Sequence, residues 1–109
     1  MNDYQVQLVE MAKGMYENFK EKAKKDIKSP KDLDIVIDVF DEVIATFTSI
    51  GEEKITAKDA IEKYKNAMTK SDPDLKFIFE RIIYDFKEMD EGFTVLVKLE
   101  ELVKSDCLK

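Results

Sequence analysis

The chain has 109 residues, of which 44% are hydrophobic and 39% are charged, and its formal net charge is −6. This length fits one domain spanning residues 1–109, and the hydrophobic content is enough for a packed core. There is no histidine, which excludes Ser-His-Asp and Cys-His catalysis, histidine ligation of a metal and a histidine-based pH switch.

The charge is uneven along the chain. Residues 1–31 hold seven lysines against five acidic residues, whereas residues 32–109 hold eleven basic residues against nineteen acidic ones. An acidic body argues against electrostatic capture of nucleic acid or of an anionic membrane. Arg81 is the single arginine, and arginine is the residue that reads base edges and clamps phosphates most effectively.

Cys107 is the single cysteine, so no intrachain disulfide can form, and a cytoplasmic location is the simplest inference. The N-terminal residues lack the apolar core of a signal peptide, and no apolar run approaches the length of a membrane span. We therefore expect no membrane partner.

The first predicted helix covers residues 3–28. Tyr4, Leu8, Met11 and Met15 recur at intervals of three and four, which is the spacing of one helix face. Lysines become frequent towards its end. The break that follows contains Ser29 and Pro30, a cap and a first-turn proline for the next helix.

Residues 33–50 form the most apolar stretch, and we expect this segment to be a central helix. Its apolar side chains would cover an arc of roughly 200°, which is wider than one neighbour can bury, so at least two helices should pack on it. A strand is the alternative, because Ile35, Ile37 and Val39 alternate. A strand would however place Phe40 on the same face as Asp38, and a helix separates such groups.

The remaining elements follow from local signals. Gly51 fits the left-handed position at a helix end, and Thr56 with Asp59 forms a capping box for a helix that runs to about residue 70. Asp72 and Pro73 begin a fourth helix, which we expect Gly92 to end near residue 91. The spacing of the apolar residues in 94–106 then predicts a fifth helix, although residues 93–97 also suit an extended segment. The expected fold is all-α, an antiparallel bundle of four to five helices with short connections.

Two charged clusters suggest alternative functions. The acidic stripe of the central helix would suit a carboxylate-dependent metal-binding enzyme, but its side chains face away from the apolar arc, and di-metal sites need inward-facing ligands. The basic end of the first helix would suit a weak nucleic-acid binder, but acidic residues are interleaved with its lysines. The acidic stripe is Asp34, Asp38, Asp41 and Glu42, and the basic end is Lys20, Lys22, Lys24, Lys25 and Lys28.

The fourth helix carries the most informative side chains. Phe77 and Tyr84 lie opposite its main apolar face, with Arg81 between them. Aromatic residues with arginine are typical of interface hot spots, so we predict that these three residues bind a protein partner or a second copy of the chain. The alternative is that another helix of the same chain covers them. The sequence thus indicates a non-enzymatic interaction module, with no cofactor, metal or small-molecule substrate predicted.

Overall fold

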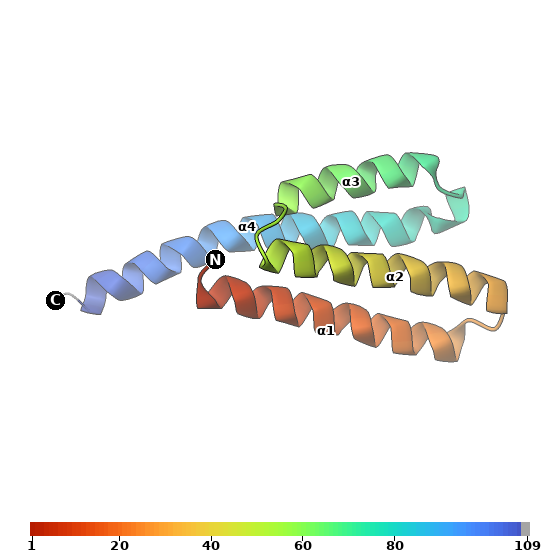
Figure 1. Cartoon of the computed structure of the whole chain (residues 1–109), viewed down its shortest axis with the longest axis horizontal. Coiled ribbons are helices and arrows are strands. Elements are labelled where there is room, and N and C mark those ends of the chain that lie inside the picture. The colour runs from red at the N-terminus through yellow and green to blue at the C-terminus, as the bar shows by residue number, and fades with distance from the viewer. Residues whose placement is uncertain (108–109) are drawn as a thin grey trace.

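A computed structural model of the chain describes the backbone of residues 1–107 and the side chains as far as residue 105. The four α-helices run antiparallel in sequence order, and the described residues contain no strand (Figure 1). This confirms the predicted all-α bundle with short connections. The helices are α1 (Asp3–Asp26), α2 (Pro30–Gly51), α3 (Ala57–Lys70) and α4 (Lys76–Cys107), with a short 3-10 helix η1 (Pro73–Leu75) before α4.

The helices form two hairpins, α1–α2 and α3–α4, and the backbones approach one another mainly within each hairpin. Large side chains join the two hairpins. The Phe47 ring of α2 lies 4.5 Å from the Phe86 ring of α4, and the Tyr64 ring of α3 stacks on Phe86 at 5.5 Å. The hydroxyls of Thr46 and Tyr64 lie 3.0 Å apart in the same layer. The apolar segment of α2 is thus in contact with the other three helices through its buried face, as its wide arc predicted.

Three of the helix starts lie where the capping signals predict them. The Ser29 hydroxyl accepts a hydrogen bond from the Asp32 amide, and Pro30 is the first residue of α2. Thr56 and Asp59 form a complete capping box at the start of α3. Asp72 caps η1, because its carboxylate accepts from the Asp74 amide. Such caps involve residues only two or three positions apart, so the sequence alone is enough to locate them.

The predicted left-handed glycine after α2 is wrong. Gly51 is the last helical residue, and the residue with positive φ is Glu53, at 61°. The reason for a glycine at position 51 is space, because a side chain there would start 3.3 Å from Cγ1 of the buried Val9. Gly51 therefore lets α1 approach the end of α2 closely.

The predicted end of the fourth helix at Gly92 is also wrong, because α4 continues through this residue to Cys107 as one helix of 32 residues. Phe93 packs on the core cluster, and a side chain at Gly92 would start 3.1 Å from Cδ2 of Leu8. A glycine inside a helix costs about 1 kcal/mol relative to alanine. The packing of Leu8 and Phe93 beside Gly92 offsets this cost. The fourth and fifth predicted helices are therefore one element.

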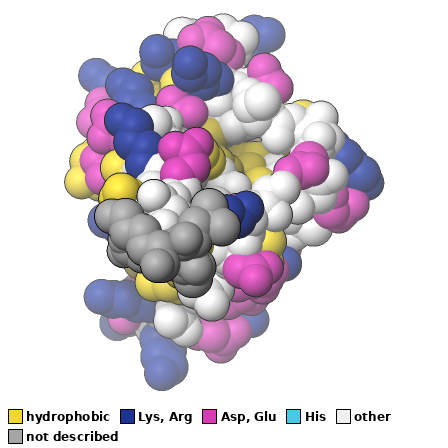
Figure 2. All heavy atoms as spheres, turned by 90° about the vertical axis from the view of Figure 1, so that its left-hand side faces the viewer, with side chains coloured by type: hydrophobic (Ala, Val, Ile, Leu, Met, Phe, Trp, Pro, Cys, Tyr) yellow, Lys and Arg dark blue, Asp and Glu magenta, His cyan; other side chains and the backbone are white. Residues whose placement is uncertain are grey.

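The last part of α4, residues 94–107, extends beyond the core cluster, which includes nothing after Phe93, and we call it the arm. In Figure 1 it projects past the N-terminus of α1 and the loop between α2 and α3, and the molecule measures 60 × 27 × 20 Å. Figure 2 looks at this end and shows acidic and basic side chains interspersed, with hydrophobic side chains between them. No helix in the described chain is both long and apolar enough to cross a membrane.

Candidate functional site

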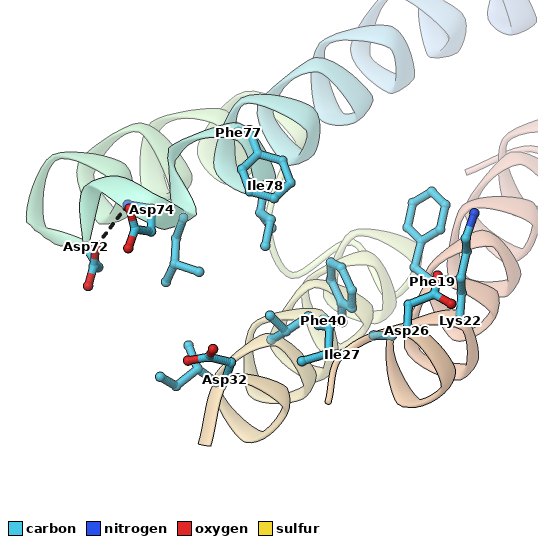
Figure 3. Close-up of a pocket in the computed structure, with 14 residues that line it drawn as sticks. Phe19, Lys22, Asp26, Ile27, Asp32, Phe40, Asp72, Asp74, Phe77 and Ile78 are labelled. Carbon is cyan, nitrogen blue, oxygen red and sulfur yellow. Dashed lines mark hydrogen bonds between the residues drawn. The ribbon is translucent and has the colours of Figure 1, made fainter. Parts of the chain in front are cut away.

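At the far end from the arm, the two hairpins leave a groove of about 690 Å³ between them (Figure 3). One wall comes from the end of α1 and the start of α2, and the other from η1 and the start of α4. Both walls are apolar because the stripes that pack each hairpin together continue to this end of the bundle, where the second hairpin no longer covers them. The apolar lining residues are Phe19, Ala23, Ile27, Ile35, Val36, Phe40, Leu75, Phe77 and Ile78.

Carboxylates occur on both walls of the groove. Asp26 and Asp32 lie on one side, and Asp72 and Asp74 lie on the other. All four residues are exposed, and none of them forms an ion pair with another residue of the described chain. Lys22 is the one basic residue that lines the groove. The groove therefore combines an apolar interior with a mainly acidic edge.

The groove continues along α4 into a second hollow of about 330 Å³. Phe19, Phe40, Phe77 and Ile78 line both hollows, so they are parts of one surface depression. The second hollow reaches as far as Arg81. Together they run over about two turns of α4 and across the gap between the hairpins.

A hydrogen-bonded network closes the inner end of this depression. Arg81 Nε lies 3.1 and 3.0 Å from the two carboxylate oxygens of Asp85, and the hydroxyl of the fully buried Tyr16 donates to Asp85 Oδ2 over 2.6 Å. The Arg81 guanidinium also lies over the Phe19 ring, 5.5 Å from its centroid. The network holds the Arg81 side chain against α1.

The network has predictable effects on protonation. Burial, followed by the hydrogen bond to Asp85, raises the pKa of Tyr16 well above its usual value. The hydrogen bond and the charge of Asp85 raise the pKa of Arg81. Both groups therefore keep their protons at neutral pH and act as hydrogen-bond donors to Asp85.

The three residues predicted to bind a partner occupy different parts of this surface. Phe77 is 70% exposed and Tyr84 is 56% exposed, so the alternative that another helix covers them is wrong for the described chain. Phe77 and Arg81 both line the second hollow, whereas Tyr84 lines neither part of the depression.

The sequence did not reveal the opposite wall. Ile35 is 40% exposed and faces the groove from α2, although it belongs to the apolar arc that we expected to be buried. The sequence signal that could have identified Ile35 is the width of that arc, because an apolar stripe that is wider than the neighbouring helices can cover leaves residues exposed at its edge.

The other two predicted clusters lie largely exposed on the surface, and some of their members form ion pairs. The acidic stripe of α2 is exposed throughout, with Asp41 bridged to Lys20 at 2.5 Å and Glu42 to Lys63 at 2.9 Å. Among the side chains that the structure describes, those of residues 1–105, there is no group of three or more acidic residues placed to hold a metal ion. In the basic end of α1, Lys20 and Lys24 pair with acidic neighbours of the same helix, which dilutes its positive charge.

Comparison of the chain with protein-family models, with curated proteins and with solved structures gives no match. The candidate site is therefore defined by its own geometry and chemistry.

Proposed function

We propose that this protein is a non-enzymatic, cytoplasmic interaction module that binds a basic amphipathic helix of a protein partner in the groove between its hairpins. The observation that carries the proposal is the combination of apolar walls with four exposed carboxylates that have no ion-pair partner in the described chain. An amphipathic helix presents an apolar stripe with charged residues on either side, which is the complementary pattern.

The apolar walls and the acidic edge of the groove would contribute differently to binding. Apolar side chains such as Ile35 and Phe77 would bury area against the ligand's apolar stripe, and each large side chain that is fully buried contributes about 1.5–3 kcal/mol before the costs of association. The carboxylates of Asp26, Asp32, Asp72 and Asp74 would pair with flanking lysines or arginines. Exposed charges of this kind add mainly to specificity and to the rate of association, and salt weakens them.

The ionisable groups of the groove favour binding over catalysis. The groove aspartates are exposed. Exposed carboxylates on the edge of an apolar surface are suited to recognise a positively charged ligand.

A pair of synthetic peptides tests the proposal. One is an amphipathic helical peptide of leucine and lysine, and the other has glutamate in place of every lysine. We expect the lysine peptide to bind in a fluorescence anisotropy titration, with an affinity that falls as salt is raised, and the glutamate peptide to bind much more weakly. Equal binding of the two peptides would show that the acidic edge does not select the ligand.

Two variants locate the binding to the groove. Ile35→Glu places a charge in the apolar wall and should weaken binding of the lysine peptide at least about tenfold, a loss of about 1.4 kcal/mol. Ala45→Glu is the matched control, because Ala45 is an exposed residue of the same helix outside the groove and the charge change is identical. The double variant Asp26→Asn/Asp74→Asn should reduce the salt dependence while leaving the fold intact. An equal effect of Ile35→Glu and Ala45→Glu would refute the groove as the site.

A further inference from the structure

The outer face of α4 carries four large apolar side chains in a symmetric arrangement. Phe77, Tyr84, Val95 and Leu102 are 70%, 56%, 63% and 64% exposed. At 100° per residue they fall within about 20° of one another, so they form a single stripe along one side of the helix. Their separations are seven, eleven and seven residues, an order that is unchanged when the helix is reversed.

We propose that two copies of the chain associate through this stripe, with their α4 helices antiparallel and a two-fold axis passing between Met89 and Asp90. Reversal about that point places Phe77 opposite Leu102 of the second copy, and Tyr84 opposite Val95. The same pairs occur twice, as a two-fold interface requires. The arm of each copy would then cover the exposed aromatic residues of the other.

The charges beside the stripe support this partner. Glu80, Lys87, Glu91 and Lys98 are all exposed and lie on one flank of the stripe, within about 40° of one another on an ideal helix. In an antiparallel pair related by a two-fold axis, each flank meets the same flank of the other copy. Lys87 then lies near Glu91 of the second copy, and Glu80 lies near Lys98. Each pairing is attractive, and symmetry doubles it to four favourable contacts.

The opposite flank of the stripe is occupied by α1, which also presents an apolar side chain there. Arg81 Nη2 lies 3.8 Å from Met15 Sδ, and Leu8 packs at Gly92, so the intervening turn of α1 runs beside the middle of the stripe. Met11 lies in that turn and is 71% exposed. Because it is close to the proposed axis, Met11 would face its equivalent in the second copy.

The arm gives a reason for the association. Residues 94–107 correspond to about 21 Å of helix, and helices in proteins gain most of their stability from the packing of an apolar face. In the single chain, nothing in the core cluster packs on it. Packing against α4 of a second copy would bury its apolar stripe along its whole length. This surface shares Phe77 with the groove, but Tyr84, Val95 and Leu102 lie outside it, so the association does not require the proposed helix ligand.

Sedimentation velocity over a wide range of concentrations tests the association. We expect a monomer–dimer equilibrium, with Leu102→Glu raising the dimer dissociation constant at least about tenfold, since each dimer loses two equivalent contacts. Val97→Glu is the matched control, because Val97 is also an exposed residue of the arm but lies on its opposite side. Leu102 does not line the groove, so peptide binding by Leu102→Glu should equal that of the parent protein when both are measured at concentrations where the parent is a monomer, which separates this proposal from the groove.

A mixing experiment tests the antiparallel register without relying on loss of binding. Glu80→Lys makes both members of the Glu80–Lys98 pair positive, and Lys98→Glu makes both negative, so each variant alone should be a monomer at concentrations where the parent protein is a dimer. A mixture of the two should form heterodimers, because every cross-pair is then attractive. A parent protein that stays monomeric at all concentrations, or variants that fail to associate on mixing, would overturn the proposal.

Discussion

The hydroxyl of Tyr16 in α1 donates a 2.6 Å hydrogen bond to Asp85 in α4, and this contact links the two hairpins at the point where the Arg81 side chain is held. Tyr16 has no exposed surface, and its ring lies 5.0 Å from Phe19 and 5.6 Å from Phe47. One residue therefore belongs both to the apolar core and to the polar network at the end of the depression.

Tyr16→Phe removes the hydroxyl and leaves the ring in place. We expect the free energy of unfolding to fall by about 1–2 kcal/mol, because the hydroxyl donates to a charged carboxylate. The loss is no larger because Asp85 keeps its ion pair with Arg81 in the variant. Tyr64→Phe is the comparison, since its hydroxyl bonds to Thr46, whose own hydroxyl also donates to the Glu42 carbonyl. The loss there should be smaller, about 0.5–1 kcal/mol. Urea unfolding measures both, and a larger loss for Tyr64→Phe would contradict the importance given to the Asp85 contact.

The buried tyrosines also predict sensitivity to high pH. Burial raises the pKa of Tyr64 from 10.0 to about 12, and the pKa of Tyr16 is raised as well. The unfolded chain therefore releases the Tyr64 proton first, so the stability that is fully present below pH 10 is lost as the pH rises towards 12. The loss from Tyr64 is on the order of 2 kcal/mol.

Unfolding measured at about pH 9 and about pH 12 checks this expectation, because most of the loss from Tyr64 falls between the pKa of 10.0 in the unfolded chain and the pKa of about 12 in the folded protein. The Tyr64→Phe variant should lose less stability than the parent protein over the same interval. If the two proteins lose the same amount, titration of Tyr64 does not contribute, and other groups such as lysines account for the change.

The three glycines lie in helices, and their surroundings predict different responses to alanine. Gly14 is exposed in the middle of α1, and a side chain there would meet no atom within 4 Å. Gly14→Ala should therefore raise the free energy of unfolding by about 0.5–1 kcal/mol through helix propensity. Gly51→Ala should gain less or destabilise, because the nearby Val9 is buried and β-branched and has little freedom to move. Thermal unfolding of the two variants would test this order, and an equal gain in both would contradict it.

The helix starts were predictable because their signals are local. The Thr56–Asp59 box and the Ser29–Pro30 start need only residues within one turn of each other. The course of α4 through Gly92 was not predictable in this way. It depends on Leu8, which is far away in the sequence, and on the packing of Phe93 against the core.

The candidate site was only half predictable for the same reason. Helical periodicity placed Phe77, Arg81 and Tyr84 on one face of α4, since that requires only the spacing along a single helix. The wall formed by Ile35 depends on how the two hairpins diverge, which periodicity within each helix does not specify. The symmetric spacing of the outer stripe also became visible only once α4 proved to be one continuous helix.

The proposed dimer contains one unfavourable contact, and removing it should strengthen the association. Glu88 is exposed near the middle of the stripe, and reversal about the proposed axis places it opposite Glu91 of the second copy. Like charges in such positions typically cost a few tenths of a kcal/mol each, and the contact occurs twice. Glu88→Gln should therefore tighten the dimer about two- to fivefold at low salt. Glu62→Gln on α3 gives the same change of net charge away from the stripe and should leave the dimer unchanged. Sedimentation velocity of both variants distinguishes this local effect from a general reduction of the repulsion between two negatively charged chains. If the general effect dominates, the two substitutions will strengthen the dimer equally.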